Sequence, residues 1–203
     1  MSNPERLSPA AIDRPGHAQE IWKDHAAVET AIAAMGITLQ ALLERRCIAA
    51  PLMVGIHTGG VWVAERLHAE LALADPLGHL DISYYRDDFS RIGMHPQVRP
   101  SHLPVSVENR HVILVDDVLQ TGRTIRAALN TLFDYGRPKS VILAALAELD
   151  GRHLPIEPNV VGLHARLDAG ERIKLTGPAP LVLVRGRAPA KPAPKAHQVE
   201  AAP

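Results

Sequence analysis

The chain has 203 residues and carries 22 basic and 22 acidic side chains, so its formal net charge is zero. This balance argues against binding nucleic acid through a uniformly positive surface, although it leaves room for a local basic face. Hydrophobic residues make up 46 % of the chain and aromatic residues only 3 %, so the core must be built mainly from aliphatic side chains.

Compartment is indicated by what the chain lacks. Cys47 is the only cysteine, so no intrachain disulfide can form, which fits a reducing compartment. Residues 1–16 contain no apolar signal core, and no apolar run reaches membrane-spanning length. We therefore expect a soluble cytoplasmic protein with no membrane partner.

Both ends of the chain have the composition of disordered segments. Residues 1–17 are polar and contain three prolines, and residues 188–203 consist largely of Ala, Pro and Lys. Such segments bury too little apolar surface to fold. We expect two disordered extensions around one domain at residues 18–187.

The first half of that domain alternates helical and strand patterns. Residues 18–46 have helical spacing, which Gly36 is expected to split into two helices. Residues 52–56 form a short apolar run typical of a buried strand, and residues 61–71 return to helical spacing. Residues 81–85 are the third strand candidate.

The second half begins with a long stretch that has no usable period. Residues 86–104 contain Gly and Pro, and such a segment inside a domain is usually a functional lid or a disordered insertion. An apolar strand follows at residues 112–115, then a helix at 125–132, then another apolar strand at 141–147. Residues 151–187 carry shorter apolar pieces and are expected to form a small cap.

Alternating strands and helices predict an α/β domain with a doubly wound parallel sheet. In such folds ligands lie beyond the carboxyl ends of the strands. His57, Arg86 and Asp116 each follow a predicted strand, so one cleft under the cap is expected to collect them.

Several side chains that can bind a ligand follow the end of the strand at residues 112–115. Asp116 and Asp117 come first, and Thr-Gly-Arg-Thr at residues 121–124 then leads into the helix. A helix N-terminus with backbone N–H groups and hydroxyl donors suits a phosphate dianion. Carboxylates would repel that phosphate, but they can accept hydrogen bonds from a vicinal diol. The implied ligand is a ribose 5-phosphate.

This stretch resembles the 5-phosphoribosyl-1-diphosphate (PRPP) loop of type I phosphoribosyltransferases. Its sequence, Val-Asp-Asp-Val-Leu-x-Thr-Gly-Arg-Thr, is most similar to that of the PyrR family of pyrimidine-operon regulators and uracil phosphoribosyltransferases. Residues 81–88 resemble the segment that opens the family's flexible catalytic loop. The resemblance covers residues 52 to 162 approximately.

The resemblance implies a reaction in which uracil and PRPP give UMP and diphosphate. It implies Mg²⁺ carried by the diphosphate, and a homodimer or a pair of dimers. The implied site has four parts: catalytic Asp116, Asp117 and Arg86; 5-phosphate-binding Thr121, Gly122, Arg123 and Thr124; diphosphate-binding Thr58, Gly59 and Gly60; and base-binding Val160, Val161 and Gly162.

The chain also departs from the family pattern. Gly59 stands where the family's diphosphate loop has arginine, so one cationic contact is absent. Gly151 and Leu163 stand where the family's RNA-binding face has histidine and lysine, while Arg152 stays in register. Because cations provide much of the affinity for RNA, these changes weaken the regulatory interpretation.

Two alternatives stay open. One is an RNA-binding attenuator of pyrimidine genes with little catalysis, and the other is a transferase for a purine base, because a PRPP loop does not select the base. A structural zinc site is not favoured, because the eleven histidines show no paired ligand spacing and there is one cysteine.

Overall fold

The computed structural model describes residues 19–82 and 101–187. Its centre is a five-stranded sheet in the order β3-β2-β4-β5-β6, and every neighbouring pair is parallel. The strands are β2 (Leu52–Ile56), β3 (Gly78–Leu80), β4 (His111–Leu119), β5 (Ser140–Leu149) and β6 (Val160–Ala165). The predicted parallel sheet is confirmed.

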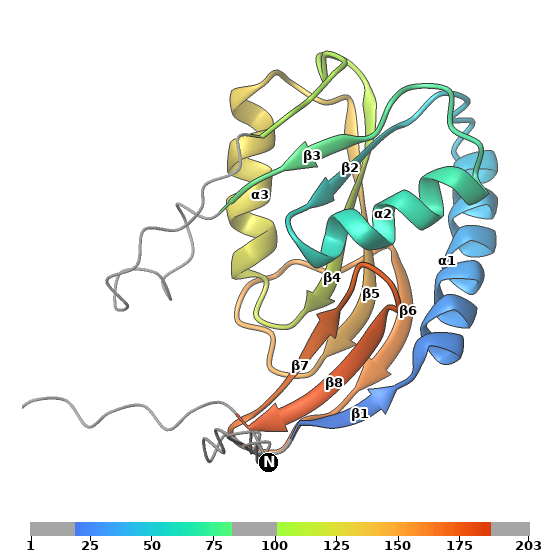
Figure 1. Cartoon of the computed structure of the whole chain (residues 1–203). Coiled ribbons are helices and arrows are strands. Elements are labelled where there is room, and N and C mark those ends of the chain that lie inside the picture. Colours follow the sequence, from blue (N-terminus) through green and yellow to red (C-terminus); the bar gives the residue numbers. More distant parts are fainter. Residues whose placement is uncertain (1–18, 83–100, 188–203) are drawn as a thin grey trace, which may run out of the picture.

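Three helices cover the two faces of this sheet (Figure 1). Helices α1 (His25–Arg45) and α2 (Gly59–Glu70) pack on one face, and α3 (Arg123–Asp134) packs on the other. The apolar run in β4 serves both faces, because Ile113 and Val115 belong to the α1/α2 side while Val112 and Leu114 belong to the α3 side. Burial on both faces explains why β4 is continuously apolar.

Helix α1 is continuous, so the predicted split at Gly36 is wrong. The helix begins after Asp24, whose side chain accepts a hydrogen bond from Ala27 N at 2.9 Å. A Cβ at Gly36 would lie 2.7 Å from the carboxyl carbon of Glu70, so the glycine provides space for the end of α2. Packing against a neighbouring helix, and not a break, explains this glycine.

Helix α1 is also the one helix in the described ranges that is long and apolar enough to span a membrane by length and composition. Of its most apolar window, 44 % is buried inside the protein. The buried positions follow helical spacing and include Val28, Ile32, Met35 and Leu39. A core helix has this pattern.

A second, antiparallel sheet lies at the carboxyl ends of the main strands (Figure 1). This cap sheet contains β1 (Glu20–Lys23), β8 (Val182–Arg187) and β7 (Glu171–Thr176) in that order. A small cap was therefore expected at the correct edge of the sheet, but its strands differ from those predicted. Strand β1, predicted as helix, pairs with β8, whereas residues 160–165 belong to the main sheet.

Strand boundaries differ from the predictions in two other places. The third strand is Gly78–Leu80, and of the strand predicted at residues 81–85 only residues 81–82 are described, which follow β3 without strand structure. Strand β4 continues past Asp116 and Asp117, and it stays paired with β5 as far as Leu119, which is in register with Glu148. Residues 1–18, 83–100 and 188–203, and with them Arg86 and most of the expected lid, lie outside the described residues.

Candidate active site

Two helices of the described fold begin at the carboxyl edge of the main sheet. Helix α2 follows β2 directly, with exposed Thr58 as N-cap, and α3 follows β4, with Gly122 as N-cap. Neither N-cap makes a side-chain capping hydrogen bond, and neither first turn contains an acid. Both positive helix ends therefore suit anions, and together they suit a ligand with two phosphate-bearing positions.

The phosphate loop, residues 121–124, is held by its own backbone and by the segment after β5. Gly122 has φ of 87°, a conformation that favours glycine. The Oγ1 of Thr121 accepts a hydrogen bond from Arg123 N at 3.3 Å. The carbonyl of Thr121 accepts from His153 N at 3.1 Å and Leu154 N at 3.2 Å. The loop is thus fixed before any ligand binds.

The two aspartates lie in the second half of β4, beside the start of α2 and shortly before α3 in the chain. Asp116 is 2 % exposed, the one buried charged side chain in the described part of the chain, and its Oδ1 accepts a hydrogen bond from Asp117 N at 3.1 Å. Asp117 is half-buried and lies against Gly59 at the start of α2. A Cβ at Gly60 would lie 2.5 Å from the carbonyl oxygen of Val115, so α2 approaches the acidic strand very closely.

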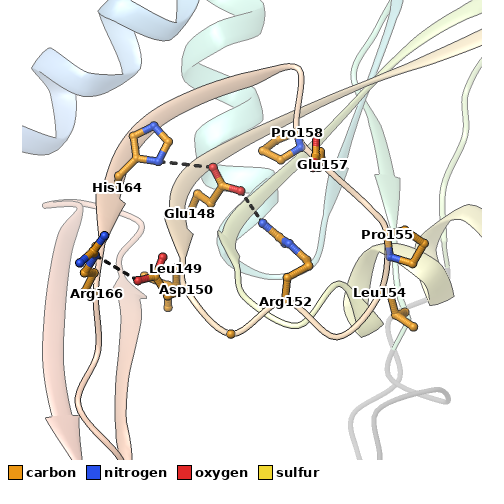
Figure 2. A pocket seen from close by; sticks show the side chains of 12 residues that line it. Glu148, Leu149, Asp150, Arg152, Leu154, Pro155, Glu157, Pro158, His164 and Arg166 are labelled. Atoms are coloured by element: carbon orange, nitrogen blue, oxygen red, sulfur yellow. Dashed lines mark hydrogen bonds and ion pairs between the residues drawn. The ribbon is translucent and has the colours of Figure 1, made fainter.

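A cavity of about 770 Å³ opens beyond the carboxyl ends of β5 and β6 (Figure 2). Its centre is occupied by Glu148, which binds Arg152 Nη2 through Oε1 and contacts His164 Nδ1 at 3.3 Å through Oε2. At one side Arg166 pairs with Asp150 at 3.3 Å. Leu149, Gly151, Leu154, Pro155, Glu157, Pro158 and Ala165 complete the lining.

This cavity shares a wall with the phosphate loop. A Cβ at Gly122 would lie 3.4 Å from Leu154 Cβ and 3.7 Å from Arg152 Cδ, and both of those residues line the cavity. A group bound in the cavity would therefore lie beside a phosphate held at the start of α3. The arrangement suits a nucleotide, with phosphate, sugar and base in adjacent compartments.

The residues predicted to bind the base lie elsewhere. Val160 is 2 % exposed in the core on the α1 side, and a Cβ at Gly162 would lie 2.8 Å from the Sδ of Met35 in α1. Val161 is half-buried in mid-strand, in register with Ala145. None of the three lines the cavity, and their role in binding a base stays a prediction.

Residues at the other end of β6 line this cavity and were not among the predicted site residues. Residues 164–166 line the cavity, because ligands of a parallel sheet meet the carboxyl ends of its strands and residues 160–162 are at the amino end. The rule that ligands meet the carboxyl ends of parallel strands would have pointed to residues 164–166 if the length of β6 had been known. The sequence pattern did not reveal how far β6 extends.

Asp116 and Asp117 are the carboxylates of the site that could contact a cation. Within residues 19–82 and 101–187, no group of three or more His, Cys, Asp or Glu side chains is arranged to hold a metal ion. The carboxylates of Asp116 and Asp117 have the hard oxygen donors that Mg²⁺ prefers. This donor set fits a cation that arrives with its own phosphate ligands.

The comparisons with known proteins agree with this geometry. Residues 27–167 match the family described as "Phosphoribosyl transferase domain". The "Bifunctional protein PyrR" of Pseudomonas entomophila is 62 % identical over 151 residues, which cover 74 % of this chain and 88 % of the relative. The protein of the same name from Nitrosococcus oceani is 68 % identical over 133 residues, covering 64 % of this chain and 75 % of the relative.

Solved structures show the same fold at low identity. A hypoxanthine phosphoribosyltransferase of Trypanosoma cruzi is similar with a TM-score of 0.61 at 16 % identity, covering 83 % of this chain and 97 % of that chain. A hypoxanthine phosphoribosyltransferase of Staphylococcus aureus has a TM-score of 0.55 at 22 % identity, with 75 % and 79 % covered. The chain belongs to the phosphoribosyl transferase domain family and, within it, to the PyrR family.

Proposed function

We propose that this member of the PyrR family is a uracil phosphoribosyltransferase, which joins N1 of uracil to C1 of the PRPP ribose, releases diphosphate and forms UMP. One observation supports this most directly: Asp116 and Asp117 lie beside the N-terminus of α2 on the strand that leads into α3, and the loop before α3 borders a cavity large enough for a base. We further infer a cytoplasmic location and a homodimer or a pair of dimers.

Each part of PRPP has a counterpart in this arrangement. The 5-phosphate would bind the start of α3 through Thr121, Gly122, Arg123 and Thr124, and the diphosphate the start of α2 through Thr58, Gly59 and Gly60. The two aspartates would accept hydrogen bonds from the 2- and 3-hydroxyls. Arg86, outside the described residues, is proposed to contact the leaving diphosphate.

Catalysis then follows from the charge that develops on the sugar. As the bond to diphosphate breaks, the ribose ring acquires oxocarbenium character, and the negative field of Asp116 and Asp117 favours that positive charge. Bound with the diphosphate, Mg²⁺ would neutralise negative charge on the leaving group, and the aspartates are the nearby donors that fit it. The electron pair of the broken bond leaves with the diphosphate, and N1 of uracil forms the new bond after losing its proton.

The base is proposed to lie in the cavity beyond β5 and β6. Uracil offers two carbonyl acceptors and N–H donors along its edges. Arg152 supplies donors and Glu148 supplies acceptors on the cavity wall, and their mutual ion pair holds both side chains in place. The proposal thus replaces Val160 and Gly162 by Glu148 and Arg152 as the groups nearest the base.

The second candidate function, RNA binding, is weakened by the position of Arg152. This arginine keeps its register with the family's RNA face, yet its guanidinium faces Glu148 inside the cavity and the side chain is only 22 % exposed (Figure 2). A cation already paired with an internal carboxylate adds little to phosphate binding. We propose weak, salt-sensitive RNA binding without sequence selectivity.

The test of the enzyme is nucleotide formation from PRPP and Mg²⁺ with uracil, hypoxanthine, guanine and adenine in parallel. We expect UMP from uracil and no product from the purines. A purine nucleotide as main product would show that the protein is a purine phosphoribosyltransferase instead. No product with any base would refute the enzymatic proposal.

RNA binding needs a separate titration at physiological salt. Labelled pyrimidine-operon leader RNA is compared with unrelated RNA of equal length, with and without UMP. Similar weak binding of both RNAs is expected. Nanomolar, leader-selective binding strengthened by UMP would show that a regulatory surface is retained.

A further inference from the structure

The first turn of α2 has few features of its own that hold it in helical form. It begins with Gly59 and Gly60, and glycine is among the poorest helix formers. Its N-cap, Thr58, makes no side-chain capping hydrogen bond. Yet this turn carries the backbone N–H groups that are proposed to bind the diphosphate. Packing against the rest of the fold therefore has to supply the support.

Two sides of this first turn contact other elements. On the inner side Gly60 packs against the backbone of β4, since a Cβ there would lie 2.5 Å from the carbonyl oxygen of Val115. Another side of the turn carries Trp62, which is half-buried and packs against the core on the α1 side. Arg66 follows four residues later, so it lies on the same face of α2 as Trp62.

The turn between β7 and β8, residues 177–181, lies against this face of α2 (Figure 1). A Cβ built on Gly177 would lie 2.8 Å from Cε3 and 3.1 Å from Cζ3 of Trp62, so the backbone of the turn packs directly on the indole ring. Arg66 Nη2 donates a hydrogen bond to the carbonyl oxygen of Pro178 at 3.3 Å. The cap sheet is therefore attached to the first two turns of α2, next to the proposed diphosphate site.

The β7–β8 turn is itself fixed to the rest of the protein. Across its base the Oγ1 of Thr176 donates a hydrogen bond to the carbonyl oxygen of Val182 at 3.0 Å, and Leu181 is fully buried in the core. Arg66 also contacts α1, because its Nε lies 3.5 Å from Oε1 of Glu29. A turn anchored in this way supports the start of α2 and does not merely cover it.

We propose that Trp62 and Arg66 are positioning residues for the diphosphate site: they join the β7–β8 turn to α2, and the joined turn keeps the first turn of the helix in its binding conformation. This deepens the proposed function and rests on it for the identity of the anion. The physical benefit is preorganisation, because an anion that meets N–H groups already in place does not have to order the helix first. The apparent affinity falls in proportion to the fraction of molecules in the competent conformation.

The test compares Trp62→Leu and Arg66→Gln with Trp22→Leu as the matched control. Trp22 is the only other tryptophan of the chain and is half-buried against the same core, but it lies on β1. Calorimetry measures the affinity for magnesium diphosphate and for PRPP with Mg²⁺, and steady-state kinetics gives the KM for PRPP and the KM for uracil.

We expect Trp62→Leu to weaken the binding of magnesium diphosphate and of PRPP about tenfold, which corresponds to a helix start that is competent in about one molecule in ten. Arg66→Gln removes one hydrogen bond and should weaken both about threefold. In both variants the KM for PRPP should rise while the KM for uracil stays within about twofold, a split that a general loss of stability would not produce. Trp22→Leu should leave both affinities within about twofold.

Amide hydrogen exchange of the ligand-free proteins measures the start of α2 without any ligand. Peptides covering residues 58–64 should exchange about tenfold faster in Trp62→Leu than in the wild type, and at the wild-type rate in Trp22→Leu. Arg66→Gln changes only a partly exposed side chain, so it provides a folded variant for the same measurement even where Trp62→Leu fails to fold.

Wild-type affinity and wild-type exchange in Trp62→Leu and Arg66→Gln would overturn the inference. Equal rises in the KM for PRPP and for uracil, or an equal loss of affinity in Trp22→Leu, would overturn it as well. Failure of the wild-type protein to bind magnesium diphosphate and PRPP would instead refute the proposed function, and the exchange rates would still decide whether the β7–β8 turn holds the start of α2.

Discussion

Removing both carboxylates from the acidic pair tests the centre of the mechanism. The variant Asp116→Asn with Asp117→Asn keeps the shape of both side chains and removes two negative charges from the sugar site. Deleting one preorganised electrostatic group typically costs about 10²–10³ in kcat. We therefore expect UMP formation to fall at least ~10²-fold, which corresponds to about 2.7 kcal/mol of transition-state stabilisation.

The stability of this variant should hardly change. Asp116 is buried, so replacing its charge by an amide removes a desolvation penalty while an oxygen still accepts the bond from Asp117 N. Loss of the Asp117 charge at the start of α2 costs about 0.3–1 kcal/mol. For a domain of this size, 1 kcal/mol corresponds to a shift in melting temperature of only ~2–4 °C.

The assay pairs initial rates of UMP formation with melting temperature, and Asp134→Asn is the control. Asp134 is an exposed acid at the end of α3, so the same chemical change there should leave the rate within a factor of about two. A double variant with a rate near that of the wild type would refute the electrostatic role. A large fall in melting temperature parallel to the rate would mean that the aspartates mainly support the fold.

Three further changes probe other parts of the molecule. Gly122→Val forces a side chain into a left-handed conformation at a cost of about 1–2 kcal/mol, so calorimetry should find weaker PRPP binding. Glu148→Gln weakens the ion-paired cavity wall and should raise the KM for uracil more than that for PRPP; equal changes would place the base elsewhere. The pKa of Glu171 is lowered by the hydrogen bond from Asp168 N and then by Arg185. The ionised carboxylate therefore stabilises the folded state fully above pH 4.5, and this contribution is lost as the pH falls through the lowered pKa. Glu171→Gln should therefore lower the melting temperature at pH 7 and much less at pH 3.

Local patterns explain why the strand, turn and helix around the acidic pair were predictable. The apolar run of β4, the acidic pair and the glycine before α3 each carry their own signal within about a dozen residues, and strand, turn and helix follow in order. Gly122 is a good example, because its positive φ is a property of the turn itself. The turn before α3 and the parallel sheet therefore needed no tertiary information.

Boundaries and partners across the fold were less predictable. Residues 20–23 form β1 only because β8, more than 150 residues later, supplies the pairing partner, and four residues carry no pattern that distinguishes strand from helix. Gly36 suggested a helix break, but its reason is the carboxyl group of Glu70 on another helix. Both errors come from contacts that link distant parts of the chain.

The sequence by itself determined the family and the strand-turn-helix unit that carries Asp116, Asp117 and residues 121–124, because each of these is written in a contiguous motif. Only the tertiary structure decided where a cavity opens beside the loop at residues 121–124, since that depends on the carboxyl ends of β5 and β6 and on the pairing of Glu148 with Arg152. It also decided what surrounds Gly59, since a Cβ built there would lie 2.5 Å from Cγ of Asp117 on β4. Such space is a property of packed neighbours and is absent from the one-dimensional pattern.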